Sequence, residues 1–247
     1  MMKPMTEEMA RERLIVALDM SDGEQVRQLV KAVGNQVTWY KVGMELFYSE
    51  GKAMVEELLK LNKKVFLDLK FHDIPNTVGG AARAATRMGV SMFNVHTAGG
   101  VQMMTEAKAA SVDEAEKRQK KPPIVLGVTV LTSMDEDTFH HDLGYEGTIG
   151  DRVIQWALMA KEAGLDGVVA SAREAAAIRE HCGNDFLIVT PGIRPGGSAA
   201  DDQSRVMDPP TALEAGSDYL VVGRPITKDP VPAAAAARML VSMIGQS

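Results

Sequence analysis

The stretch that organises this chain reads Val65-Phe66-Leu67-Asp68-Leu69-Lys70-Phe71-His72-Asp73-Ile74-Pro75-Asn76-Thr77. It begins as an apolar strand and stops in a turn, and it carries Asp68, Lys70 and Asp73. Strand side chains alternate between two faces, so Asp68 and Lys70 are expected on the same face. An apolar strand that ends in paired charges, with a third charge in the following turn, is typical of an active site.

Similar strands recur on both sides of this stretch, at residues 14–19, 39–44, 65–71, 91–97, 124–130, 167–170, 186–190 and 219–224. Helical patterns lie between or after them, at residues 21–33, 49–61, 77–88, 101–118, 149–163, 172–181 and 231–244. Nearly continuous apolar strands that alternate with helices indicate a parallel sheet buried on both faces. Eight such units predict an α/β protein built as a (β/α)8 TIM barrel, whose chemistry collects at the carboxyl ends of the strands.

Length and composition agree with one barrel domain over residues 1–247, in which residues 1–13 form a polar leader that is disordered in part. The chain has 247 residues and 45% hydrophobic content, with no apolar run near the roughly 20 residues that cross a bilayer. The leader lacks the apolar segment of a secretory signal, so the expected location is cytoplasmic. Cys182 is the single cysteine, which excludes an internal disulfide, and the net charge of -6 argues against a nucleic-acid partner.

Charged and polar residues that would be costly inside a barrel fall late in their strands or just beyond them. These residues are Asp19, Lys41, Asp68, Lys70, His96, Thr129 and Arg224, with Asp73, Thr132 and Arg194 in the loops. The barrel therefore predicts a polar funnel at the carboxyl ends of the strands.

Asp68 and Lys70 could form a purely structural ion pair. Buried ion pairs stabilise proteins little, however, because desolvation offsets their attraction, so a cluster that also holds Asp19, Lys41 and Asp73 favours chemistry. At about 4 Å and an effective dielectric near 20, one pair is worth on the order of 4 kcal/mol, enough to hold the lysines charged. A charged lysine can stabilise and protonate a carbanion, and loss of carbon dioxide would relieve repulsion from Asp68. The cluster predicts a decarboxylation.

A second group of residues follows strands seven and eight: Thr190-Pro191-Gly192-Ile193-Arg194-Pro195-Gly196-Gly197 and Gly223-Arg224. Barrels often bind phosphate there, through backbone amides that glycines expose and through guanidinium groups. The alternative is a flexible turn plus one surface arginine. Residues 194–205 lack apolar periodicity and predict a loop that closes over the phosphate.

Four histidines lie in loops or at strand ends: His72, His96, His140 and His141. Their spacing does not match a metal site, and the lysines beside Asp68 would repel a divalent cation. We therefore expect no metal, and we expect His96 to be a packed or hydrogen-bonded barrel residue.

Several motifs resemble those of the orotidine 5'-phosphate decarboxylase family. They are Ala17-Leu18-Asp19, Tyr40-Lys41-Val42-Gly43, the run from Asp68 to Thr77, Leu131-Thr132-Ser133, Pro191-Gly192-Ile193-Arg194, Gln203 and Val222-Gly223-Arg224. The Asp-x-Lys-x-x-Asp-Ile-Pro-Asn-Thr run is highly specific, whereas the other motifs alone are weak. The resemblance extends from Leu14 past Arg224, and it implies a TIM barrel of the ribulose-phosphate-binding type.

The resemblance implies conversion of orotidine 5'-monophosphate to UMP and carbon dioxide in de novo pyrimidine biosynthesis, without a metal or organic cofactor. Lys70 would protonate C6 and Asp68 would lie against the departing carboxylate. The family's substrate contacts would fall to Asp19 and Lys41 at the ribose, to Thr132 and Ser133 at the pyrimidine, and to Arg194, Gln203, Arg224 and the Gly223 amide at the phosphate. Pro191 would be a further substrate contact. The resemblance further implies that Asp73 and Thr77 reach into the partner's site, which makes a homodimer with shared active sites the active unit.

Two other readings stay open. One is a magnesium-dependent 3-keto-gulonate-6-phosphate decarboxylase or a hexulose-phosphate synthase, similar barrels that share the Asp-x-Lys-x-x-Asp run but carry a metal-binding Glu where this chain has Lys41. The other is a phosphate-binding barrel without catalysis. The polar segment 135–147 has no assigned role.

Overall fold

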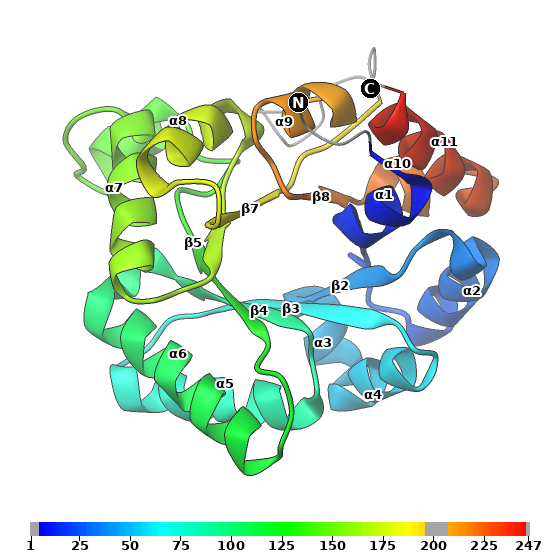
Figure 1. The fold of residues 1–247 in the computed structure, drawn as a ribbon, viewed down its shortest axis with the longest axis horizontal. Coiled ribbons are helices and arrows are strands. Elements are labelled where there is room, and N and C mark those ends of the chain that lie inside the picture. Colours follow the sequence, from blue (N-terminus) through cyan, green and yellow to red (C-terminus); the bar gives the residue numbers. More distant parts are fainter. Residues whose placement is uncertain (1–4, 196–206, 246–247) are drawn as a thin grey trace.

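The strands of the computed structural model form one closed barrel, and the structure describes residues 5–195 and 207–245. Eight parallel strands pair in sequence order, and β8 closes the barrel against β1 (Figure 1). The strands are β1 Leu14–Ala17, β2 Trp39–Gly43, β3 Lys64–Phe71, β4 Met92–His96, β5 Ile124–Val128, β6 Gly167–Val169, β7 Leu187–Thr190 and β8 Tyr219–Val222. The predicted TIM barrel is confirmed.

Helices surround the barrel and cover the outer faces of its strands (Figure 1). They are α1 Glu7–Arg13, α2 Gly23–Val33, α3 Met44–Glu50, α4 Lys52–Lys60, α5 Pro75–Met88, α6 Gly100–Lys117, α7 Ile149–Glu162, α8 Ala172–Cys182, α9 Pro209–Glu214, α10 Arg224–Thr227 and α11 Pro232–Ile244. Within the described ranges, none of these helices has both the length and the apolar character that crossing a bilayer requires.

Two boundaries differ from the sequence prediction because of backbone geometry. The single helix expected over residues 49–61 is two helices, since Gly51 has a φ of 66° that ends α3 before α4 begins. The strand expected to include Arg224 stops at Val222, and Arg224 is instead the first residue of α10, where Pro225 suits the first turn. The short helix α9 was not predicted either.

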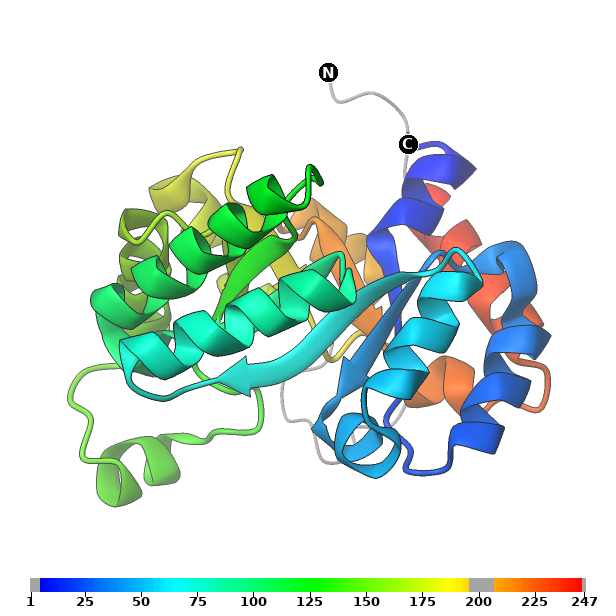
Figure 2. The ribbon, with the colours of Figure 1, turned by 90° about the horizontal axis from the view of Figure 1, so that it is seen from below.

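The polar leader contains a helix that its composition did not predict. Residues 7–13 form α1, whose Ala10 is fully buried. Glu12 fastens the helix to the barrel, because its carboxylate accepts hydrogen bonds from Trp39 Nε1 at 3.2 Å and from Lys64 Nζ at 2.5 Å. Helix α1 lies at the end of the molecule opposite the segment 135–147 (Figure 2). The prediction of a polar leader did not include this helix, because the polar contacts that hold it give no periodic signal in the sequence.

The interior of the barrel is apolar at its centre and becomes polar towards the carboxyl ends of the strands. Lys41, Asp68 and Asn94 each stand two residues beyond an interior side chain of β2, β3 or β4, so the period of two places them in the next layer up. The apolar interior consists of Ile15, Ala17, Trp39, Phe66, Met92, Leu126, Val189 and Val221. The alternation that fills the barrel thus also sets these polar side chains at its mouth.

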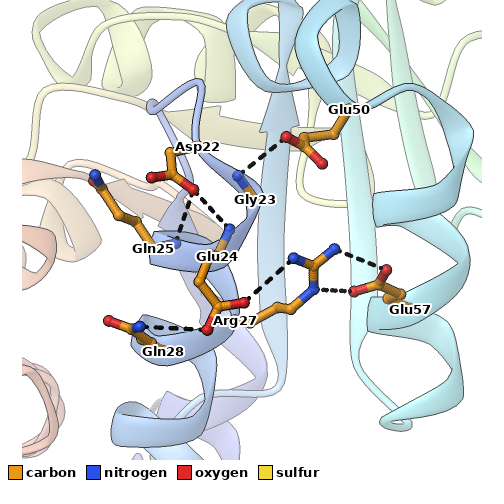
Figure 3. A network of polar contacts seen from close by, with 8 residues as sticks. All are labelled: Asp22, Gly23, Glu24, Gln25, Arg27, Gln28, Glu50 and Glu57. Carbon is orange, nitrogen blue, oxygen red and sulfur yellow. Dashed lines mark hydrogen bonds and ion pairs between the residues drawn. The ribbon is translucent and has the colours of Figure 1, made fainter.

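The start of α2, just after β1, is tied to both neighbouring helices (Figure 3). Asp22 caps α2 by accepting hydrogen bonds from two backbone N–H groups of its first turn, and Glu50 of α3 accepts from the Gly23 N–H at 3.2 Å. Arg27 reaches α4, where it donates to both carboxylate oxygens of Glu57 at 2.8 and 3.1 Å. These contacts fix the chain that follows Asp19.

Candidate active site

A cavity of about 590 Å³ opens at the carboxyl ends of the strands. Residues from seven of the eight strand ends or following loops meet in it, as the barrel rule requires. The predicted site residues that line it are Asp19, Lys41, Asp68, Lys70, Thr132, Pro191, Arg194, Gly223 and Arg224. The sequence prediction missed Met20, Gln25, Thr227 and Lys228, which also line this cavity. They lie in the turns and helices beyond the strands, where strand periodicity gives no signal.

Four charged side chains of alternating sign form a chain of ion pairs in this cavity. Lys41 Nζ lies 2.7 Å from Asp19 Oδ1 and 3.2 Å from Asp68 Oδ2. Lys70 Nζ lies 2.8 Å from Asp68 Oδ1. The Asp68 side chain is 13% exposed and the Lys41 side chain 11%, so the central pair is largely desolvated, whereas Asp19 at the rim is 58% exposed.

The electrostatics of the central pair favour the charged forms of both groups. Burial by itself would raise the pKa of Asp68, but the two ammonium groups of Lys41 and Lys70, with hydrogen bonds from Lys70 and Asn94, hold that pKa below its usual range. Burial would likewise lower the pKa of Lys41, but Asp68 and Asp19 outweigh it and raise the pKa. An aspartate and ammonium groups therefore face the cavity at neutral pH.

Gly43 provides the space that this pairing needs. A β carbon at this position would lie 3.1 Å from Lys41 Nζ and 3.3 Å from Asp19 Oδ1. A larger residue there would require the Lys41 ammonium group and the Asp19 carboxylate to shift by a few tenths of an ångström. The Tyr-Lys-Val-Gly motif thus supplies both the Lys41 ammonium group and, at Gly43, the space that the Asp19 carboxylate needs beside it.

The backbone at Lys70 departs from the strand geometry that the sequence predicts. Its φ is 51°, in the left-handed region that residues other than glycine rarely adopt. The pairing of β3 with β4 shifts register between Leu67 and Phe71. Asp68 and Lys70 do meet, but the simple alternation of an extended strand is not the reason for it.

Asn94 on β4 is the main residue of this site that sequence reasoning missed. Its side chain is fully buried, its Oδ1 accepts a hydrogen bond from the Lys70 N–H at 2.8 Å, and its Nδ2 donates to Asp68 Oδ1 at 2.7 Å. A signal was available, because Asn94 is a polar residue between the apolar Phe93 and Val95 in the middle of its strand. Its partners could not be read from that signal.

Two arginines, Arg194 after β7 and Arg224 after β8, line the same cavity, whose apolar lining includes Val128, Val169 and Ile193. Ile193 pairs with Met207, and the Arg194 N–H donates to the Met207 carbonyl at 3.0 Å. The loop after β7 therefore leaves and returns at the same edge of the cavity. Gln203 and most of the loop predicted over residues 194–205 lie outside the described residues.

Three predicted site residues are exposed and do not line the cavity of their own chain: Asp73, Thr77 and Ser133. Asp73 Oδ1 accepts from the Ile74 N–H at 2.6 Å, at the turn that leads into α5. The structure therefore does not join Asp73 to the Lys70 cluster of the same chain.

His96 is packed and hydrogen bonded, as predicted. Its Nδ1 accepts from the Ala98 N–H at 3.3 Å, and its ring stacks on His72 at 5.4 Å and meets the edge of Trp156 at 5.9 Å. Burial, followed by the charges of His72 and Lys70, lowers the pKa of His96 to about 4. His96 is therefore neutral at physiological pH.

The remaining predicted histidines belong to the segment 135–147. His140 Nδ1 lies 2.8 Å from the Tyr145 carbonyl, and His141 Nδ1 lies 2.8 Å from Asp137. Both follow Phe139, which is fully buried in a π-helical turn at Thr138–Asp142. Among the described residues, no three His, Cys, Asp or Glu side chains are grouped as metal ligands.

Known proteins share sequence similarity with this chain over the barrel and the charge cluster. The profile of the family described as "Orotidine 5'-phosphate decarboxylase / HUMPS family" matches residues 12–239. The chain belongs to this family. The match includes every described residue of the candidate site.

Members of this family with assigned names are similar over almost the whole chain. Orotidine 5'-phosphate decarboxylase of Moorella thermoacetica is 51% identical over 227 residues, which are 92% of this chain and 90% of the relative. The enzyme of the same name from Geobacter metallireducens is 50% identical over 240 residues, 97% of this chain and 99% of the relative. The crystal structure of orotidine 5'-phosphate decarboxylase from Lactobacillus acidophilus has a TM-score of 0.84 and 38% identity, covering 94% of this chain and 98% of that one.

Proposed function

We propose that this protein is an orotidine 5'-phosphate decarboxylase, a carboxy-lyase of de novo pyrimidine biosynthesis that converts orotidine 5'-monophosphate to UMP and carbon dioxide. The observation that carries the proposal is the chain of alternating charges from Asp19 through Lys41 and Asp68 to Lys70, in one cavity with two arginines. Relatives of that name, about half identical to this chain, support the same conclusion.

The chemistry follows from the position of the charges. The substrate carboxylate on C6 is placed against Asp68, and the bond from C6 to the carboxyl carbon breaks, so that carbon dioxide leaves and the electron pair stays on C6. The ammonium group of Lys70 stabilises this carbanion and transfers a proton to C6, after which solvent recharges the amine. Lys41 keeps Asp68 ionised throughout, which maintains the repulsion that the loss of neutral carbon dioxide relieves.

The rest of the substrate is assigned to the two ends of the cavity. Asp19 and Lys41 are proposed to bind the ribose hydroxyls, and Thr132 and Ser133 the pyrimidine. Phosphate is proposed to bind beyond β7 and β8, through Arg194, Gln203, Arg224 and the Gly223 amide, and Pro191 is proposed as a further substrate contact. Binding energy released there can drive loop closure and so assist the reaction at C6 rather than only the affinity.

A homodimer with shared active sites is proposed as the active unit. Asp73 and Thr77 are exposed at the mouth of the barrel and do not line their own cavity, which leaves them available to a partner's site. Exposed apolar side chains on the segments that follow β2, β3 and β5 support an interface at this face: Met44, Tyr48, Ile74, Leu131 and Leu143. A cytoplasmic location is proposed as well, because a charged nucleotide does not cross a bilayer unaided.

The magnesium-dependent sugar-phosphate decarboxylase and synthase barrels are less favoured. Lys41, where those enzymes are expected to hold a metal-binding Glu, is paired with both Asp19 and Asp68. Its ammonium group would repel a cation bound to either carboxylate.

The test is an assay of orotidine 5'-monophosphate decarboxylation, by ultraviolet absorbance and carbon dioxide release, with and without EDTA. We expect turnover that EDTA does not change, and a loss of roughly 10²-fold or more in the Lys70→Ala variant with little change in UMP affinity. Turnover that EDTA abolishes would favour the magnesium-dependent enzymes, and UMP binding without turnover would favour a non-catalytic barrel. Residual activity of Lys70→Ala above a few per cent would contradict the role of Lys70 as proton donor.

A further inference from the structure

Asn94 joins the two reacting side chains of the proposed site without lining the cavity itself. Its amide spans from the Lys70 backbone to the Asp68 carboxylate, with hydrogen bonds of 2.8 and 2.7 Å. The identity of its two ends follows from the partners, because a backbone N–H only donates and an ionised carboxylate only accepts. Asn94 is fully buried, so both contacts are shielded from water.

The backbone around Lys70 explains why such a bridge is needed. Leu67 pairs with Phe93 and Phe71 pairs with Val95, so residues 68–70 of β3 lie opposite Asn94 alone on β4. A bulge of this kind leaves backbone groups without ladder partners. The Lys70 N–H finds its acceptor in the Asn94 side chain, at the residue where φ is 51°.

The carboxylate of Asp68 is oriented by the same amide. Asp68 Oδ1 accepts from both Lys70 Nζ and Asn94 Nδ2, whereas Oδ2 faces Lys41 at 3.2 Å. Because asparagine is neutral, it adds a donor to Asp68 without disturbing the balance of two aspartates and two lysines. A carboxylate at position 94 would instead repel Asp68.

We propose that Asn94 is a positioning residue for decarboxylation: its amide holds Lys70 in the left-handed conformation that returns the ammonium group to Asp68, and it fixes the rotation of the Asp68 carboxylate. The inference rests on the proposed function. Under this proposal, the reaction requires Asn94 of β4 to position Lys70, in addition to the residues of β3 itself.

The kinetic test compares Asn94→Ala and Asn94→Asp with the wild type, using Ser111→Ala as the control. Ser111 is also buried and polar, but it lies on α6, where it contacts Thr86 of α5, and it does not line the cavity. For Asn94→Ala we expect kcat to fall by about 10²-fold, because a reacting group displaced by about 1 Å costs this much, with KM and UMP affinity changed only a few-fold. Ser111→Ala should keep the kcat of the wild type.

The pH profile separates positioning from a merely structural role. Loss of the Asn94 donor removes one of the contacts that keep Asp68 ionised, so the acid limb of kcat for Asn94→Ala should move to higher pH. Asn94→Asp keeps an acceptor for the Lys70 N–H but donates to Asp68 only when protonated. Its kcat relative to the wild type should therefore rise as the pH falls, and this variant serves if Asn94→Ala does not fold.

A crystal structure of either variant tests the inference without any assay, so its failure can be told apart from failure of the proposed function. We expect Lys70 to leave the positive φ region and Lys70 Nζ to move away from Asp68. The inference is overturned if Lys70 keeps its conformation, if kcat stays within a few-fold of the wild type, or if kcat and UMP affinity fall together with an unchanged pH profile.

Discussion

Asp68 shows how much one residue can depend on its neighbours. Donors from β2, β3 and β4 converge on its two oxygens, through Lys41, Lys70 and Asn94. Burial is the largest single influence and would raise the pKa of Asp68, but the three donors together outweigh it, so the pKa falls although the group is mostly out of water. Ionisation of a buried aspartate beside charged lysines is what the proposed chemistry requires.

At the same scale, Arg224→Ala should raise KM for orotidine 5'-monophosphate steeply and also lower kcat/KM. A charge-assisted contact to phosphate is worth about 1.5–3 kcal/mol, which corresponds to roughly 10- to 10²-fold. The measurement is steady-state kinetics with the nucleotide, and with orotidine plus free phosphite, which should restore part of the turnover of the phosphate-lacking substrate in the wild type.

Arg238→Ala is a suitable control for this variant. Arg238 lies on α11 and pairs with Asp229, and its side chain is 65% exposed. Its removal should leave KM unchanged. A normal KM for Arg224→Ala would contradict the assignment of the phosphate end.

At the scale of elements, helices that reach the mouth of the barrel are fixed at their starts. Asp22 satisfies backbone donors of α2, and Glu50 adds an acceptor from α3 (Figure 3). Asp22→Ala should lower the free energy of unfolding by about 1 kcal/mol, as the loss of a helix cap does. Chemical denaturation measures this change.

Asp22→Ser retains a capping oxygen and should recover most of the lost stability. Equal stability losses in both variants would mean that the cap is not the source of the effect. Neither variant should change kcat, because Asp22 does not line the cavity.

The segment 135–147, which has no role predicted from the sequence, is held by a series of aromatic contacts. Phe139 packs on Tyr145, Tyr145 meets the edge of Trp156, and Trp156 meets His96. This column of aromatic rings ends at His72, which stacks on His96. His72 immediately precedes Asp73 in the chain. The segment is thus connected to the turn between β3 and α5 through Trp156 and His96.

His96 should make stability depend on pH within this column. Its pKa is lowered to about 4 in the folded protein and is about 6.5 when unfolded. The unfolded chain therefore binds the proton first, so the stabilisation present above pH ~6.5 is lost progressively as the pH falls towards ~4. His96→Asn keeps an acceptor for the Ala98 N–H and should flatten the dependence of Tm on pH in this window. His181→Asn, at an exposed position of α8, is the control, and a slope unchanged by His96→Asn would contradict the prediction.

At the scale of the whole molecule, the barrel assembles a cavity from strands far apart in the sequence but leaves Asp73 outside it. If a partner completes the site, two inactive variants should complement each other. Mixing and refolding Lys70→Ala with Asp73→Asn yields hybrid dimers in which one site is intact and the other carries both changes. Random pairing in a two-fold dimer predicts about a quarter of the wild-type activity.

The separate variants, each refolded alone, are the controls for this experiment. Sedimentation should show a dimer at assay concentration. A mixture no more active than the average of the two separate variants would contradict shared active sites.

Much of the barrel could be predicted because its signals are local. Buried parallel strands are nearly continuous apolar runs, and polar residues two positions beyond an interior side chain must stand at the mouth. These short-range patterns were enough to predict the strand ends and the family resemblance. They also predicted that Asp19, Lys41 and Asp68 would be grouped with the two arginines.

Other features depended on contacts that no short-range pattern contains. Helix α1 is held by Glu12 through Trp39 and Lys64, and the break between α3 and α4 depends on the φ of Gly51. Both were missed, since a polar leader and a helical pattern look ordinary in sequence.

The amino-acid sequence by itself determined the barrel and the residues at its mouth, because strand and helix periods are properties of neighbouring residues. Only the tertiary structure decided how the charges meet. Lys70 takes a left-handed backbone opposite a bulge, and Asn94, 24 positions further along the chain, accepts its N–H and aligns Asp68. The physical reason is that a hydrogen bond between two strands depends on their register, and register is set only when the whole barrel closes.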